Sequence, residues 1–419
     1  MPSLFLYKGG IFLAFDFKPI TKICLNITEM CQCACPFCFA EYHPHRISYQ
    51  VAKDAADWII KNSELTGEVG SIGFFGGEPL LEWDTIIVPL TKYIKDERGL
   101  KDFELGVTTN CLLLDEEKLK FMKKYDFGLL CSIDGAKETQ DYNRPCRNGQ
   151  SSFDIIDEKI SLILKYFPDT LMRSTIIPAT CEHYFKNLEY GWNKGFYHSF
   201  TIINQFEEWP EDKRKILEEQ VRKFSNYLIT CFREGLPFMR QRTLEQAINK
   251  IVGTNLHFAQ GNVERIKFDD LGRCCGLGSG YGAINYEGDI FTCQEAVSRE
   301  KDKNIFYIGN IYTGIDKERQ QKLFDDVYAN GGNVYNSVDK NKCKECPIEA
   351  SCNMNSCLVN NYLERQLFDI QADAMCWWNN LMAKEAQYIC YILGTENNEY
   401  FKDYFKWVIT SQGGTLSND

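Results

Sequence analysis

Residues 22–39, KICLNITEMCQCACPFCF, join a short apolar segment to a loop that contains four cysteines. The first seven residues are predicted to form a buried β-strand, because apolar and β-branched residues dominate them. Cys31, Cys33, Cys35 and Cys38 then follow within eight positions. A loop this dense in thiols holds a metal, forms a disulfide or carries out redox chemistry. Its place directly after a strand puts that chemistry at one edge of a sheet.

The same alternation of short apolar segments and longer amphipathic ones continues to about residue 206. Strands are predicted at 22–28, 70–75, 103–108, 128–133, 171–177 and 198–204. Helices are predicted between them at 49–64, 82–97, 115–124, 152–166 and 183–194. Six such units in succession predict an α/β fold, with a parallel sheet and outer helices, either doubly wound or a partial barrel. In both cases the functional site lies at the carboxyl ends of the strands.

Length and composition narrow the class of protein. A chain of 419 residues is expected to form two or three domains. A net charge of −11 argues against a nucleic-acid partner, and no apolar run is long enough to predict a membrane span. The apolar start is interrupted by charged and glycine residues and lacks a signal-peptide pattern, so a β-hairpin and a cytoplasmic location are expected.

Changes in composition along the chain predict five parts. Residues 1–19 form the hairpin, 20–206 the α/β part and 207–264 a charged helical bridge. Residues 265–380 are rich in glycine and cysteine, and metal is expected to stabilise such a small unit. Residues 381–419 form C-terminal helices and a polar tail.

The chain contains 19 cysteines, and 12 of them lie within 31–38 and 274–376. In the first group, Cys31, Cys35 and Cys38 have the spacing C-x3-C-x2-C. Three thiolates can hold an iron–sulfur cluster and leave one iron open to a ligand. The alternatives are structural zinc bound by all four cysteines and a ferredoxin-type electron carrier. Zinc favours two separated pairs, and a ferredoxin needs a fourth cysteine in a denser run.

This spacing, followed by an aromatic residue, resembles the radical S-adenosylmethionine (radical SAM) enzymes. The resemblance continues through GFFGGEPLLE (73–82), TTN (108–110) and SIDGAKETQDYNRPCRNGQSSF (132–153), and so covers the first half of the chain. It implies a (β/α)6 partial barrel of the TIM type and a [4Fe–4S] cluster that binds S-adenosylmethionine. It also implies that the cluster delivers an electron to S-adenosylmethionine, which yields a 5′-deoxyadenosyl radical that abstracts hydrogen from a substrate.

The resemblance also assigns the residues that contact the cofactor. Phe37 is expected to lie against adenine, with core packing as its alternative. Gly76, Gly77 and Glu78 form the turn whose backbone receives the methionine amino group. Ser132 and Arg144 occupy the positions that contact the cofactor. Arg173 points either into the barrel, as a second partner for an anion, or out to solvent.

The second cysteine region resembles the SPASM extension of this family, which binds two auxiliary [4Fe–4S] clusters. Cys275 and Cys293 are part of a C-x12-G-x4-C pattern, and the later run CKECPIEASCNMNSC has a last gap of four residues where the family has three. The implied ligands of the outer cluster are Cys343, Cys346, Cys352 and Cys376. Those of the inner cluster are Cys275, Cys293 and Cys357, with either Cys274 or an open iron in the fourth place. Zinc is the alternative occupant.

SPASM enzymes of this kind mostly act on peptides or proteins. The leading hypothesis is a thioether or carbon–carbon crosslink in a ribosomally made peptide; the alternatives are sulfatase maturation, peptide epimerisation and a non-enzymatic multi-cluster electron carrier. Sulfatase maturases carry an aspartate after the G-x4-C cysteine, whereas this chain has Gln294 followed by Glu295. An amide cannot accept a proton usefully, which counts against that alternative.

The expected partners are a peptide or small protein substrate and an external reductant such as flavodoxin or ferredoxin. Many peptide maturases carry an N-terminal winged-helix-like domain that binds the leader peptide. Only 21 residues precede the first predicted strand, so that domain is not expected in this chain. Leader recognition then falls to the barrel mouth, the hairpin, the bridge or a separate leader-recognition protein.

Overall fold

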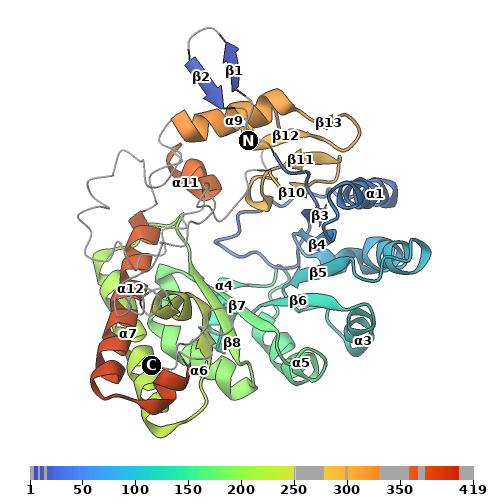
Figure 1. The fold of residues 1–419 in the computed structure, drawn as a ribbon. Helices are drawn as coiled ribbons and strands as arrows, with labels where there is room; N and C mark the ends of the chain where they lie inside the picture. The colour runs from blue at the N-terminus through green and yellow to red at the C-terminus, as the bar shows by residue number, and fades with distance from the viewer. Residues whose placement is uncertain are drawn as a thin grey trace.

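Six parallel strands form the centre of the computed structural model, which describes residues 4–7, 10–13, 17–249, 251, 278–297, 301–329, 358–366 and 373–404. Each strand lies within one residue of its predicted position. They are β3 (Lys22–Thr28), β4 (Ser71–Gly76), β5 (Glu104–Thr109), β6 (Phe127–Ser132), β7 (Leu171–Ile176) and β8 (His198–Ile203). Figure 1 shows helices along the outer side of the curved sheet, which confirms the α/β class.

Capping residues mark the ends of several outer helices. They are α1 (Tyr49–Thr66), α3 (Glu116–Lys124), α4 (Lys137–Asn143), α5 (Ser152–Tyr166) and α6 (Tyr184–Lys194). The Ser48 hydroxyl accepts a hydrogen bond from the backbone N–H of Val51 and so caps the start of α1. Gly67, with φ of +72°, ends the same helix in the left-handed conformation. Asp115 and Ser151 cap α3 and α5 in the same way.

The helical segment between β4 and β5 departs from a regular α-helix. It consists of η1 (Pro79–Glu82), η2 (Trp83–Ile87), α2 (Val88–Lys92) and η3 (Tyr93–Glu97), of which η1 is a 3₁₀ helix and η2 and η3 are π-helical. The sequence predicts one continuous helix at 82–97. Pro89 has no backbone N–H to donate, so the regular hydrogen-bond pattern cannot continue through this segment.

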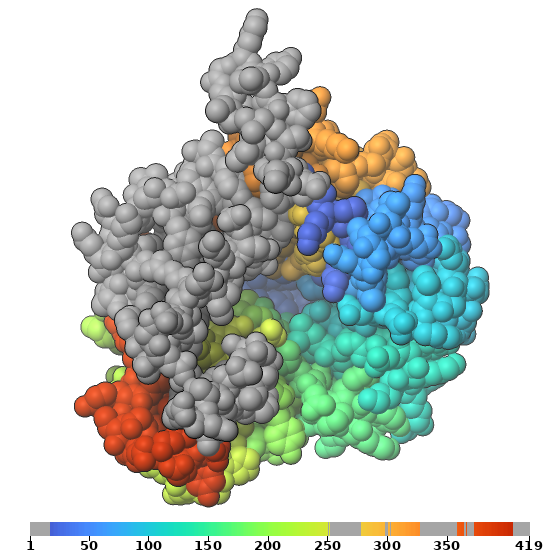
Figure 2. All heavy atoms as spheres, viewed as in Figure 1, coloured from blue at the N-terminus to red at the C-terminus, as the bar shows by residue number. Residues whose placement is uncertain are grey.

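The sheet continues beyond the six barrel strands at both edges. Its order is β13-β12-β11-β10-β3-β4-β5-β6-β7-β8-β9. The added strands are β9 (Arg240–Gln241), β10 (Tyr281–Ile284), β11 (Asp289–Phe291), β12 (Tyr307–Asn310) and β13 (Gly314–Ile315). β10 pairs with β3 in parallel, and Figure 2 shows the later strands against the N-terminal part of the barrel. Strands from the cysteine-rich region therefore extend the barrel sheet.

Four further helices and a hairpin lie outside this sheet. They are α7 (Glu211–Glu234), α9 (Lys317–Ala329), α11 (Leu358–Arg365), α12 (Asp373–Thr395) and the antiparallel pair β1 (Leu4–Tyr7) and β2 (Gly10–Leu13). Arg222 on α7 donates to both carboxylate oxygens of Glu385 on α12, and Trp378 of α12 is buried beside Tyr184 of α6. α12 is thereby fixed to the outer layer of the barrel.

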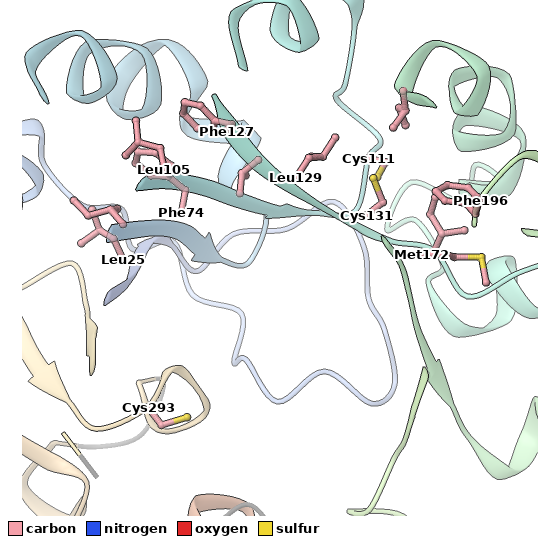
Figure 3. Packing of buried hydrophobic residues seen from close by; sticks show 14 of the residues in the cluster. Leu25, Phe74, Leu105, Cys111, Phe127, Leu129, Cys131, Met172, Phe196 and Cys293 are labelled. Carbon is pink, nitrogen blue, oxygen red and sulfur yellow. The ribbon is translucent and has the colours of Figure 1, made fainter. Parts of the chain in front are cut away.

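The main core lies between the sheet and its helices. Figure 3 shows Leu25, Phe74, Leu105 and Phe127 in this layer, from four adjacent strands. Cys111 and Cys131 are fully buried there, as expected for a free cysteine that packs as a small apolar residue. None of the helices in the described residues has both the length and the apolar character that a membrane crossing requires.

Candidate functional site

The cysteine loop runs from the end of β3 to the start of α1, and backbone hydrogen bonds tie it to the turn that follows β4. The Gly77 N–H donates to the Thr28 carbonyl at 2.7 Å, and the Glu78 N–H donates to the Met30 carbonyl at 2.8 Å. The two segments that the sequence connects only by resemblance, the cysteine loop and the GGEP turn, are therefore in direct contact.

Glycine is required at both positions of this contact. A Cβ on Gly76 would lie 2.1 Å from the carbonyl oxygen of Thr28, and Gly76 has φ of +131°. A Cβ on Gly77 would lie 2.2 Å from the carbonyl oxygen of Met30. Both distances are far below van der Waals contact, so any side chain would separate the turn from the loop.

The loop is held on its other side by the segment that follows α4. Cys33 and Cys146 form an isolated antiparallel β-bridge. The Ala34 N–H donates to the Pro145 carbonyl at 2.9 Å, and the Arg147 N–H donates to the Gln32 carbonyl at 2.7 Å. The Arg147 side chain also donates to the Cys31 carbonyl at 3.1 Å. The first cysteine loop is thus fixed between two of the motifs that the sequence singled out.

The thiols of this loop differ in their electrostatics. Cys33 lies between Cys31 and Cys35, in hydrogen-bond contact with both sulfurs. Contact with the Cys33 thiol lowers the pKa of Cys31 and of Cys35, whereas the same contacts raise the pKa of Cys33. The Asn110 amide also donates to the Cys31 sulfur at 3.6 Å. Cys31 and Cys35 are therefore the thiols that favour the thiolate form, which is the form that binds iron.

The residues present fit a cluster with three thiolate ligands. Cys31, Cys35 and the exposed Cys38 come from one loop, and the Cys38 N–H donates to the Cys35 carbonyl at 3.1 Å. No three His, Cys, Asp or Glu side chains among the described residues are placed to hold a single metal ion. A four-iron cluster does not need its ligands to converge on one atom, because each cysteine binds a different iron atom.

Glu78 connects the GGEP turn to the TTN motif at the end of β5. Its buried carboxylate accepts hydrogen bonds from the Thr109 hydroxyl at 2.8 Å, the Asn110 N–H at 2.8 Å and the Leu80 N–H at 3.1 Å. Burial raises the pKa of Glu78 to about 7. The Glu78 side chain thus holds the GGEP turn against the end of β5, and its backbone N–H contacts the cysteine loop.

Arg144 has a partner that sequence reasoning missed. Its Nε and Nη2 each donate to a carboxylate oxygen of Asp134 at 3.0 Å, and both side chains are buried. Asp134 also accepts from the Thr175 N–H at 2.8 Å, which joins the turn after β6 to β7. The Arg144 guanidinium lies over the ring of Phe37, 5.3 Å from its centroid. The only available signal for Asp134 was its place in the SIDG segment.

Arg173 lies on the inner face of the sheet. Ser132 of β6 and Phe200 of β8 are its register partners on the two neighbouring strands. The adjacent Met172 packs against Gly191 of α6 on the outer face of the sheet, so Arg173 takes the opposite, inward face. Burial, with the nearby Arg144 guanidinium, lowers the pKa of Arg173 to about 10. Of the two orientations expected from the sequence, the structure shows the one that points into the barrel.

The segment after β11 brings a carboxylate toward this inner face. The Gln294 amide oxygen accepts from the Tyr281 hydroxyl at 2.6 Å and from the Cys293 thiol at 3.5 Å. Glu295 instead interacts electrostatically with Arg173, and burial raises the pKa of Glu295 to about 7. Figure 3 shows Cys293 apart from the labelled core residues of β3–β7, across the cysteine loop.

Most of the predicted auxiliary-cluster ligands lie outside the described residues. These are Cys275, Cys343, Cys346, Cys352 and Cys357, together with the alternative ligand Cys274. Cys293 follows β11, and Cys376 lies in the first turn of α12, where the Asn380 amide donates to its sulfur at 3.7 Å. The assignment of all seven to two clusters remains a prediction.

A family model, the Radical SAM superfamily, matches residues 25–188. This range begins in β3, ends in α6 and contains the cysteine loop, the GGEP turn and Arg144. Residues 25–188 therefore form a Radical SAM domain. Such a domain implies S-adenosylmethionine and a [4Fe–4S] cluster as its cofactors, and the thiol loop described above fits the cluster.

The relatives of this enzyme include protein-modifying enzymes. It is 23% identical over 369 residues to the serine-type anaerobic sulfatase-maturating enzyme of Bacteroides thetaiotaomicron, covering 80% of this chain and 82% of that protein. Matches to several other curated relatives span only 36% to 55% of their length.

Two groups of solved structures share its fold. Native anSMEcpe with bound S-adenosylmethionine and the Cp18Cys peptide has a TM-score of 0.65 at 16% identity, covering 90% of this chain and 99% of that one. Streptococcus suis SuiB bound to its precursor peptide SuiA has a TM-score of 0.55 at 17% identity, covering 86% of this chain and 76% of that one. At these identities the likeness shows the fold.

The contact between the GGEP turn and the cysteine loop can be tested with two alanine variants of the same segment. Gly77→Ala should lower the free energy of unfolding by about 2 kcal/mol or more and weaken S-adenosylmethionine binding at least tenfold, because the added Cβ meets the Met30 carbonyl at 2.2 Å. Gly73→Ala is the matched control, since its Cβ meets only ordinary contacts at 3.8 Å. Urea unfolding and calorimetric titration of reconstituted protein measure both effects. Equal behaviour of the two variants would contradict the proposed constraint.

The raised pKa of Glu78 predicts a pH dependence of stability. The folded state binds the carboxyl proton of Glu78 more tightly than the unfolded chain does, because an unfolded glutamate has a pKa of ~4.3. The contribution of Glu78 to stability is therefore complete below that pH and is lost as the pH rises through the folded pKa of about 7. The difference in unfolding free energy between wild type and Glu78→Gln should fall by about 3 kcal/mol over this window. Urea unfolding at a series of pH values measures it; a constant difference would contradict the prediction.

Proposed function

We propose that this enzyme modifies a residue of a peptide substrate by radical chemistry and forms a thioether or carbon–carbon crosslink in a ribosomally synthesised peptide. When bound, the cluster and S-adenosylmethionine supply a 5′-deoxyadenosyl radical that abstracts hydrogen. The observation that carries the proposal is the meeting of the cysteine loop, the GGEP turn and the segment after β6 at the carboxyl ends of the strands. A multi-cluster electron carrier would need the thiols but none of these other contacts.

In this proposal the loop cysteines Cys31, Cys35 and Cys38 hold the cluster. Asn110, which donates to the Cys31 sulfur, helps to fix the loop. Gly76 and Gly77 bring the turn against the loop, so that its backbone groups can contact the methionine amine. Phe37, held under the guanidinium of Arg144, is the proposed partner of the adenine ring.

The charges on the inner face support binding of a carboxylate. Arg144 lies near enough to Arg173 to lower the pKa of Arg173, and Asp134 is the carboxylate that pairs directly with Arg144. The two guanidiniums and the Asp134 carboxylate carry a net positive charge, which Glu295 compensates only when it is ionised, so a bound anion would be stabilised here. The carboxylate of S-adenosylmethionine is such an anion, and Ser132, next to Arg173 in register, adds a hydroxyl donor.

The structural neighbours support a peptide as the substrate, because SuiB and anSMEcpe were both solved with peptides bound. We propose two further [4Fe–4S] clusters in residues 265–380, which gives three in all, held by the seven cysteines that the sequence predicts. We also propose the five-part division of the chain, an external reductant of the flavodoxin or ferredoxin type, and a separate leader-recognition protein.

Sulfatase maturation is the second candidate. The similarity to the Bacteroides enzyme favours it, as does the position of Glu295, which follows Cys293 by two residues and interacts with Arg173. A carboxylate whose pKa is about 7 can accept a proton near neutral pH. Against this candidate, the residue directly after Cys293 is Gln294, whose amide oxygen is already bound by Tyr281.

Two alanine variants in the first loop test which thiols hold the cluster. Cys35→Ala should abolish formation of 5′-deoxyadenosine from S-adenosylmethionine and dithionite, because it removes one of three ligands. Cys33→Ala should retain it to within about threefold, because the raised pKa of Cys33 disfavours the thiolate that iron requires. Anaerobic reconstitution, iron analysis and chromatography of the nucleoside products measure this. If both variants lose activity alike, the assignment of three ligands is wrong.

The reaction itself can be assigned by product mass. We expect the reduced enzyme to remove two hydrogens from a cysteine-containing peptide encoded beside its gene, with the cysteine thiol no longer available to alkylation. An aldehyde that reacts with a hydrazine would assign sulfatase-type maturation instead, and an unchanged mass with an inverted residue would assign epimerisation. Iron-loaded protein that produces no 5′-deoxyadenosine would contradict an enzymatic function altogether.

A further inference from the structure

Cys33 and Cys146 are opposed across two short antiparallel segments beside the candidate cluster site. The hydrogen bonds that hold them run between their neighbours, from the Ala34 N–H to the Pro145 carbonyl and from the Arg147 N–H to the Gln32 carbonyl. In an antiparallel pair this pattern defines the non-hydrogen-bonded position, where the two Cα atoms are about 4.5 Å apart and the side chains project from the same face. The two thiols are in hydrogen-bond contact.

This arrangement meets the requirements for a disulfide. Disulfide-bonded cysteines have Cα atoms roughly 4.4–6.8 Å apart, a range that includes the opposed position described above. The backbone on both sides is already fixed by the two cross-segment hydrogen bonds, at 2.9 Å and 2.7 Å, so no rearrangement of the chain is needed. Cys146 is partly exposed, whereas Cys33 is buried beneath it, so an oxidant reaches Cys146 first.

We propose that Cys33 and Cys146 are a reversible redox pair, a thiol modification site that forms a disulfide in the cluster-free protein in the presence of a small disulfide oxidant. The Cys146 thiolate attacks one sulfur of the oxidant, here oxidised glutathione, and releases one glutathione thiolate. The Cys33 thiol then gives up its proton as its sulfur displaces the second glutathione from Cys146. The protein loses two protons and two electrons, and one oxidised glutathione becomes two reduced molecules.

The pair has a consequence for the ligand cysteines. The Cys33 sulfur contacts those of Cys31 and Cys35, so an oxidised Cys33 has three nearby thiols with which to bond. The opposed, non-hydrogen-bonded position selects Cys146. Once bonded to Cys146, Cys33 cannot consume either ligand, and Cys31 and Cys35 remain available as thiols. The existence of the pair does not depend on the proposed function; its protective effect on the cluster ligands does.

Peptide mapping of oxidised, cluster-free protein tests the pair directly. After treatment with oxidised glutathione under anaerobic conditions and alkylation of the remaining thiols, trypsin releases residues 23–46, with five cysteines, and residues 138–147, which contain Cys146. We expect these two peptides to be joined by one disulfide, with the four other cysteines of the first peptide alkylated. Addition of a thiol reductant should separate them.

Matched variants identify the partner within the cysteine-rich peptide. Cys33→Ser and Cys146→Ser should each abolish the joined peptides, and Cys35→Ser, two residues away, should leave them. In Cys146→Ser the first peptide should instead contain an internal disulfide, with two fewer alkylated thiols than cysteines. Joined peptides in Cys33→Ser, or internal disulfides in wild type, would overturn the proposal.

Circular dichroism shows whether each variant is folded. The experiment measures a covalent link in cluster-free protein, so its result does not depend on enzyme activity. A protein that forms the link but does not cleave S-adenosylmethionine would contradict the proposed function alone. A protein that cleaves the cofactor but never forms the link would contradict the redox pair alone.

Discussion

The close approach of two backbones, at Gly76 and Gly77, is the constraint on which the candidate site depends. The carbonyls of Thr28 and Met30 occupy the space where a side chain on either glycine would lie. Because each of these carbonyls also accepts a backbone N–H from the turn, the cysteine loop is held in place by the strand next to it. The position of the thiol loop is therefore set by main-chain contacts.

A second set of contacts carries this order across the barrel. Glu78 links the turn to the end of β5, and Asp134 links Arg144 to β7. Both carboxylates are buried and accept several hydrogen bonds, so each fixes the segments that it joins. These two sets of polar contacts join β4 to β5 and β6 to β7 at their carboxyl ends.

The strands and most helices were predictable because they depend on local patterns. Apolar alternation placed the six barrel strands within one residue, and capping residues such as Ser48 mark where helices begin. Contacts between residues distant in sequence were not predictable. Asp134 as the partner of Arg144, the bridge between Cys33 and Cys146, and the pairing of β10 with β3 all depend on the tertiary fold. The ligand cysteines outside the described residues remain predictions from the sequence.

The pairing of β10 with β3 also explains why Gln294 and Glu295 differ. Register places Tyr281 beside Lys22 at the start of β3, and the Tyr281 hydroxyl bridges the Cys24 sulfur and the Gln294 amide. Gln294 is thereby held against the added strand. Glu295, the next residue, instead interacts electrostatically with Arg173. A substrate on the inner face of the sheet would meet a carboxylate from the C-terminal strands and a guanidinium from β7. The site is therefore complete only when both parts of the sheet are assembled.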